Sequence, residues 1–218
     1  MVAIDSAHEI PAPSETAHTG QVVLFAFLGS ALLAAASVVL NVSDGNGWRV
    51  AAEMVSRFSL LLFVAALIVE PLARLIPTRF MQAVGRERGN LILGFAAASA
   101  VALACLAAPA NLGGEGMSAP AIAYCTLTAM ILVVMLFSGH PATIRHLGAP
   151  AWRALQRIAT SYFWLVFTLA GLEHLVGPHR PDGWYGFSLL LLTGALLLRF
   201  ADSFVAHWRH RDVAGKVA

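Results

Sequence analysis

Long apolar runs separated by short polar segments organise this sequence. Six runs are long enough to cross a bilayer: residues 21–40, 55–76, 90–109, 119–138, 158–176 and 184–204. A membrane-spanning helix needs about 20 mostly apolar residues. None of the connections between the runs is long enough to fold as a catalytic domain of its own. The pattern predicts an all-α membrane protein, a six-transmembrane-helix bundle in which residues 21–204 form one domain.

Two polar segments flank the predicted bundle. Residues 1–20 form a polar N-terminal tail without the basic stretch that begins a secretory signal, so we expect the first helix to stay uncleaved. Residues 205–218 form a basic tail. Composition agrees with a bilayer environment, since 58% of the 218 residues are hydrophobic, 12% are charged and the mean hydropathy is +0.73.

Basic residues are distributed unequally between the two sides of the predicted bundle. One side carries Arg74, Arg79, Arg86, Arg88, Arg145, Arg153, Arg157, Arg199, Arg209, Arg211 and Lys216, and the other carries Arg49, Arg57 and Arg180. Short loops rich in arginine and lysine stay on the cytoplasmic side, which predicts that both termini are cytoplasmic. The net charge of +2 is therefore a topology signal. No basic patch interleaved with aromatic residues indicates a nucleic-acid partner.

Charged residues near the ends of the spans are the first candidates for function, because charge inside a membrane is costly. Three pairs have a spacing that lets them meet on one helix face: Glu53 with Arg57, Glu70 with Arg74, and Arg199 with Asp202. One interpretation is that they anchor the helices at the interfaces, with long side chains reaching water. The other is that Arg57 or Glu70 faces the bundle interior and contacts a cofactor.

Histidines offer a second set of candidates. His174 follows Glu173 at the end of the fifth run, and adjacent helical residues point about 100° apart, so these two form no catalytic dyad. His174 is either a hydrogen-bonded interfacial residue or a haem ligand. His140 lies in the preceding connection. His207 and His210 lie three apart in the basic tail, where a metal site would need a third ligand.

The small residues of the third run and the two cysteines are expected to pack between helices. Gly94, Ala98 and Ala102 recur every four residues, a pattern that lets a second helix approach closely. Cys105 and Cys125 lie within separate spans and have no metal-binding spacing. We expect both to pack as small apolar residues, with a disulfide between them as the alternative.

Several short motifs resemble the ferric reductase-like transmembrane domain family, which includes the haem-binding membrane subunit of the bacterial methionine sulfoxide reductase system. The matching segments are Ser-Arg-Phe-Ser-Leu at 56–60, Glu-Pro-Leu-Ala-Arg-Leu at 70–75, Gly-Arg-Glu-Arg-Gly at 85–89, residues 91–95, Arg-His-Leu-Gly at 145–148, Trp152 and Leu-Gln-Arg-Ile at 155–158. The resemblance covers residues 54–204. It implies a six-helix electron-transfer subunit of the bacterial cytoplasmic (inner) membrane, haem b as a cofactor, and a periplasmic or cytoplasmic redox partner protein.

The sequence departs from that family at the positions where haem-ligating histidines are expected. Ser99 or Ala100 stands at the position in the third helix, Gln156 at the start of the fifth, and Leu169 about thirteen residues later. His174 lies five residues beyond Leu169 and about 140° around the helix, so it is no simple substitute. The usual pair of haem-ligand histidines is absent from these positions.

Two hypotheses of function follow. The first is an electron-transfer membrane subunit, with haem held by His174 and His140, or with a quinone or flavin contacted by Arg57 and by aromatics such as Tyr162 and Trp164. The second is a noncatalytic membrane scaffold or assembly subunit that kept the fold and lost haem binding. A small transporter is a weaker alternative, because the sequence shows no inverted repeat and no pair of broken helices.

Overall fold

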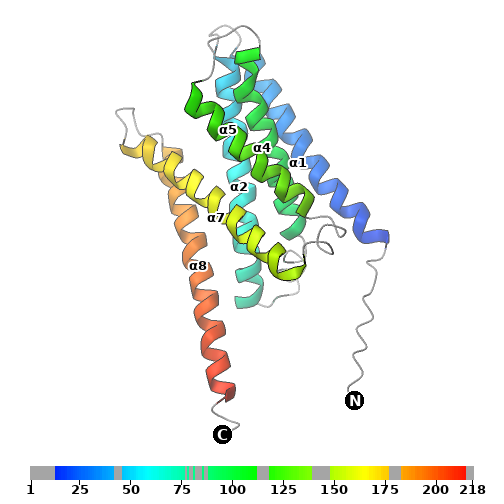
Figure 1. Cartoon of the computed structure of the whole chain (residues 1–218), viewed down its shortest axis with the longest axis vertical. Coiled ribbons are helices and arrows are strands. Elements are labelled where there is room, and N and C mark those ends of the chain that lie inside the picture. Colours follow the sequence, from blue (N-terminus) through cyan, green and yellow to red (C-terminus); the bar gives the residue numbers. More distant parts are fainter. Residues whose placement is uncertain are drawn as a thin grey trace.

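Six helices make up the part of the chain that the structure, a computed structural model, describes (Figure 1). The described residues are 13–41, 46–76, 78, 81, 85, 88–111, 118–138, 148–176 and 183–214. The helices are α1 (Pro13–Leu40), α2 (Gly47–Leu75), α4 (Arg88–Asn111), α5 (Ala119–Ser138), α7 (Ala149–Val176) and α8 (Gly183–Ala214). Each is long and apolar enough to cross a membrane, which confirms the predicted six-helix membrane architecture.

Three helices begin earlier than the apolar runs suggest. α2 begins at Gly47 and α7 at Ala149, because arginine and glutamate lower the hydropathy of these first turns but are good helix formers. α1 begins at Pro13, inside the segment expected to be a polar tail, and proline suits the first position of a helix. α8 continues to Ala214, well past the predicted end of its span.

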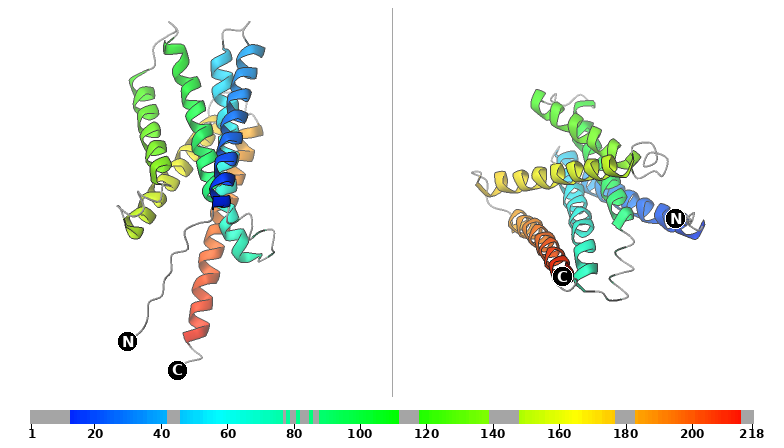
Figure 2. Two further views of the ribbon diagram at one scale, coloured as in Figure 1. Left: turned by 90° about the vertical axis from the view of Figure 1, so that its right-hand side faces the viewer. Right: turned by 60° about the horizontal axis from the view of Figure 1, so that its bottom comes forward.

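Helix α2 lies at the centre of the bundle and packs against α1, α4 and α8 (Figures 1 and 2). Small residues bring α1, α2 and α4 together. A Cβ atom added to Gly94 would lie 3.2 Å from Cβ of Ala26 on α1, and Ala98 and Ala102 are also buried. The predicted close approach of another helix to this face of α4 is confirmed. Ser30, fully buried in α1, donates a hydrogen bond to the Ala26 carbonyl oxygen at 2.7 Å.

Helices α5, α7 and α8 are arranged more openly. α7 crosses the bundle obliquely, as Figure 2 shows, and packs mainly against α8. Gly171 permits this contact, because a Cβ atom there would lie 2.9 Å from Cγ of Leu189 on α8. Large apolar side chains are exposed around the bundle, among them Phe25, Leu32, Met130, Phe137, Leu190 and Phe200. Such a surface suits a lipid environment, in which lipid chains surround the outer faces of the helices.

Four phenylalanines fill the centre of the bundle. α2 supplies Phe63, α4 supplies Phe95, and α7 supplies Phe163 and Phe167. The distances between their ring centroids range from 4.8 to 6.3 Å. Cys105 packs in a second cluster with residues of α1 and α2, and both cysteines are free thiols. The packing role expected for Cys105 is therefore confirmed, and the disulfide alternative is not formed.

Candidate functional site

A cavity of about 290 Å³ lies at one end of the bundle and is called here the Arg57 cavity. Residues from α2, α4, α5, α7 and α8 line it, so it depends on the whole bundle. Its polar lining consists of Arg49, Glu53, Ser56, Arg57, Tyr124, His174, Tyr185 and Ser188. The cavity reaches the surface, because its lining includes the exposed residues Arg49, Leu106, Tyr124, Ala170 and His174.

The charged pair in this cavity is shared between two helices. Arg57 contacts Oε1 of Glu53 at 2.5 Å, which confirms the predicted pairing one helical turn apart. The hydroxyl group of Tyr185, on α8, donates a hydrogen bond to the same oxygen at 3.1 Å. A carboxylate that accepts both bonds is held in one position, and it ties α8 to α2.

Arg57 also lies against two aromatic rings of α8. Its guanidinium carbon is 5.4 Å from the ring centroid of Trp184 and 5.8 Å from that of Tyr185. These distances are within the range of a cation–π interaction. With a side chain only 23% exposed, Arg57 is a partly buried cation between a carboxylate and two rings.

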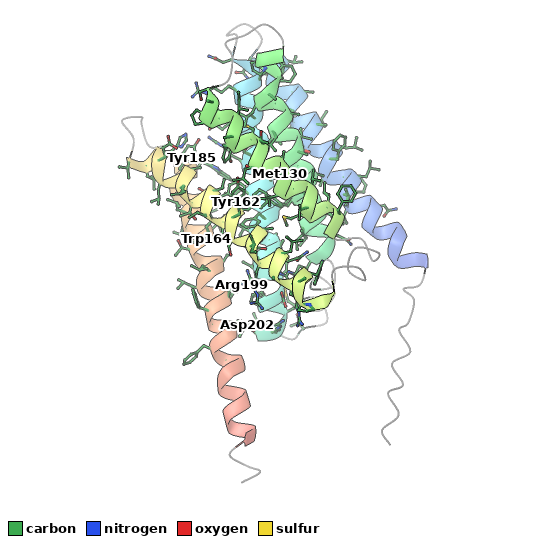
Figure 3. The ribbon with its side chains drawn as sticks, viewed as in Figure 1. Met130, Tyr162, Trp164, Tyr185, Arg199 and Asp202 are labelled. Carbon is green, nitrogen blue, oxygen red and sulfur yellow. The ribbon has the colours of Figure 1, made fainter. Side chains whose placement is uncertain are left out.

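His174 lies on the other wall of the same cavity. Its ring stacks on Tyr185 with centroids 4.0 Å apart and planes inclined by 18°. Its Nδ1 is 2.8 Å from the carbonyl oxygen of Ala170. A carbonyl oxygen only accepts, so Nδ1 carries the hydrogen in this contact. The Tyr185 side chain lies beside α7 near the upper part of the bundle in Figure 3.

The structure therefore brings two of the three site candidates, Arg57 and His174, into one cavity. His140, the third, lies outside the described residues. The aromatic rings beside Arg57 are those of Trp184 and Tyr185, not the expected Tyr162 and Trp164. Tyr162 exchanges a hydrogen bond with Thr128 at 2.7 Å, and Trp164 Nε1 lies 3.4 Å from the Leu192 carbonyl oxygen.

The described side chains do not fit a haem held by two histidines. The residues at the expected ligand positions do not converge. Ser99 is buried and lines a small pocket, Gln156 lines a separate cavity, and Leu169 is 55% exposed. His174 is the one histidine whose side chain the structure describes, and the phenylalanine cluster occupies the bundle centre. Within the described part of the chain, no group of three metal-ligating residues occurs.

A second charged cluster lies at the opposite end of α2. Glu70 pairs with Arg74, as predicted, and also with Arg88 of α4. Arg74 in turn contacts Oδ2 of Asp202 on α8 at 3.1 Å. Asp202 thus has a partner on a distant helix, and its pairing with Arg199 on its own helix stays a prediction. This cluster links α2, α4 and α8, as the Arg57 cavity does at the other end.

Six membrane-spanning helices and an aromatic-walled cavity at one end define an integral membrane protein with a candidate ligand site. Comparison of the chain with protein-family models, curated proteins and solved structures found no match. The function proposed below therefore rests on the geometry of the site and on the motif resemblance described above.

Proposed function

We propose that this protein is a membrane subunit of an electron-transfer system and binds a quinone-type electron carrier in the Arg57 cavity. The observation that carries the proposal is the position of Arg57, a cation held against Trp184 and Tyr185 on the wall of a cavity that opens between membrane helices. Ligand sites are typically concave and largely apolar, with a few convergent polar groups. This cavity has that composition.

The groups of a quinone complement the side chains that line the Arg57 cavity. Its flat ring can stack on aromatic side chains, and its carbonyl oxygens can accept hydrogen bonds from a donor such as the Arg57 guanidinium. Its apolar tail needs a route to the lipid. The exposed lining residues Leu106, Tyr124 and Ala170 lie on apolar helices, and the tail can leave the cavity beside them.

Haem has no part in this proposal, because the positions that would hold it are occupied by Ser99, Gln156 and Leu169. Electrons would instead pass between the bound quinone and a redox partner protein on the periplasmic or cytoplasmic side. The basic-residue distribution supports an orientation with both termini in the cytoplasm. The motif resemblance supports the bacterial cytoplasmic membrane. The Arg57 cavity then faces the periplasm.

A noncatalytic scaffold is the second candidate. Its supporting observation is the packed cluster of Phe63, Phe95, Phe163 and Phe167, which fills the centre of the bundle between α2, α4 and α7. A scaffold needs the six helices and their outer surfaces, and it needs no ligand in the Arg57 cavity. Ligand binding therefore separates the two candidates.

Binding of a short-chain quinone to the purified protein, followed by quenching of tryptophan fluorescence, tests the proposal. We expect saturable quenching that Trp184→Phe reduces. Arg57→Gln should weaken the affinity at least about tenfold, equivalent to about 1.4 kcal/mol. Arg74→Gln is the matched control, since Arg74 forms the same kind of pair with Glu70 at the other end of α2. It should bind quinone as the wild type does.

Three results would count against quinone binding at this site. Unsaturable quenching of folded wild-type protein would favour the scaffold, and equal loss of affinity in both arginine variants would place the site elsewhere. A Soret absorbance band in protein purified from haem-sufficient cells would show that haem binds after all. Fusions of a reporter enzyme to the C-terminus test the orientation, which requires the fusion to be active only in the cytoplasm.

A further inference from the structure

A second cavity, of about 300 Å³, lies at the opposite end of the bundle and is called here the Arg88 cavity. α4, α5 and α7 form it. Glu70, which pairs with Arg88, is 13 residues from Arg57 along α2, so the two cavities are about 20 Å apart along that helix. The quinone proposal makes no use of the Arg88 cavity.

The lining of the Arg88 cavity has a polar part and an apolar part. Arg88, Asn90 and Gln156 supply polar groups, and Trp152 lies with them. The remaining wall is apolar and consists mainly of Ile92, Leu93 and Met135. A ligand that fits this lining has a polar head group and an apolar chain.

Arginines gather at the end of the bundle that holds this cavity, and Arg88 is the one of them that lines it. Arg199 of α8 interacts electrostatically with two cations, Arg88 and Arg157, and with one anion, Glu70. Glu70 is also shared with Arg74. Arginines gathered at the end of an apolar bundle repel one another, and an anion bound among them relieves this repulsion.

Arg88 provides a second, independent observation. Its Nε atom is buried and has no hydrogen-bond partner among the described residues, although the terminal nitrogen Nη1 pairs with Glu70. A buried donor without an acceptor destabilises a folded protein. Arg88 lines the cavity, so a rotation of its side chain can present the guanidinium group to an anionic oxygen bound there. Arginine suits phosphate in particular, because its planar donors match two phosphate oxygens.

We propose that the Arg88 cavity binds the phosphate head group of an anionic phospholipid, with an acyl chain against Ile92, Leu93 and Met135. The apolar wall distinguishes a lipid from free phosphate, which needs polar groups on every side. Trp152 fits the same position, since tryptophan is enriched where a bilayer meets water. Basic pockets between membrane helices are known to suit anionic lipid head groups.

Thermal unfolding of the full chain in a zwitterionic detergent tests this proposal. Three additions are compared: phosphatidylglycerol, phosphatidylcholine with the same acyl chains, and inorganic phosphate. Phosphatidylglycerol at saturating concentration should raise the unfolding temperature by about 5 °C. Phosphatidylcholine and inorganic phosphate should each raise it by less than about 1 °C.

Gln156→Glu places a negative charge in the cavity lining without removing any arginine, and it should abolish the shift caused by phosphatidylglycerol. Gln21→Glu, at an exposed position of α1, is the matched control and should keep the full shift. If Gln156→Glu does not fold, Arg157→Gln takes its place and should reduce the shift by half or more.

Two outcomes would overturn the proposal. An equal shift in Gln156→Glu and Gln21→Glu would mean that the lipid acts on the general surface of the bundle. A shift with inorganic phosphate as large as that with phosphatidylglycerol would identify a site for free phosphate. Neither outcome affects the quinone proposal, because Arg57→Gln should respond to phosphatidylglycerol as the wild type does.

Discussion

The two ends of α2 carry the same short motif in different surroundings. Glu53 and Arg57 form a pair one helical turn apart, and so do Glu70 and Arg74. At the Arg57 end the pair is joined by a tyrosine hydroxyl and by two aromatic rings. At the Glu70 end it is joined by further ions, Arg88 and Asp202.

The difference between the ends comes from the helices that pack against α2. α8 lies along α2 and supplies Trp184 and Tyr185 at one end and Asp202 at the other, as the labelled Tyr185 and Asp202 side chains show in Figure 3. The same acid and arginine spacing therefore forms the wall of a cavity in one place and an ionic link in the other. Neighbouring helices, rather than the motif itself, determine the role.

Replacing the acid at each end should have the largest effect and should separate the two ends. Glu70→Ala leaves both Arg74 and Arg88 without the carboxylate they share, and we expect it to lower the free energy of unfolding by about 2 kcal/mol, since two partly exposed ion pairs are lost. Glu53→Ala leaves Arg57 against its two aromatic rings and should cost about 1 kcal/mol. Reversible unfolding in mixed detergent micelles measures both values. Equal losses would mean that the additional ions at the Glu70 end contribute nothing.

Apolar run length was sufficient to predict the six helices, but not where α1, α2 and α7 begin or where α8 ends. The two acid-first pairs were also predictable, because spacing within one helix determines whether such side chains can meet. The close approach at Gly94 followed from the small residues on one face of α4. Each of these features depends on local sequence or on the bilayer.

Contacts between distant helices were not predictable in the same way. Tyr162 and Trp164 were expected beside Arg57 because they are aromatic, but the oblique course of α7 places them elsewhere. Trp184 and Tyr185 were missed, although a signal was present: they begin the sixth run on the side predicted for Arg57. Nothing local to Asp202 indicated that it would pair with Arg74, 128 residues earlier in the chain.

Gly171→Ala tests whether the Arg57 end depends on the close packing of α7 against α8. The added Cβ atom would lie 2.9 Å from Cγ and 3.1 Å from Cδ2 of Leu189, so the two helices must separate or Leu189 must move. Gly194→Ala on α8 is the control, since no atom of another helix lies within 4 Å of its added Cβ. We expect Gly171→Ala to be less stable than this control by about 2 kcal/mol in detergent unfolding.

The same substitution should distinguish the two ends of the bundle. Gly171 lines the Arg57 cavity, so its replacement should weaken quinone binding severalfold. The shift in unfolding temperature caused by phosphatidylglycerol should stay as in the wild type, because the Arg88 cavity has no contribution from Gly171 or Leu189. Loss of both responses together would indicate that the two ends are not independent.

Tyr185→Phe should have the smallest effect and isolates one hydrogen bond at the Arg57 end. The variant keeps the ring that stacks on His174 and lies against Arg57 but loses the hydroxyl group that donates to Glu53. A hydrogen bond to a charged acceptor at a partly exposed position contributes about 1 kcal/mol, which corresponds to a loss of about fivefold in an equilibrium constant. Combining Tyr185→Phe with Glu53→Gln in a double-mutant cycle measures the coupling between the two side chains. A coupling near zero would mean that the Trp184 and Tyr185 rings, without the hydroxyl, account for the difference between the two ends of α2.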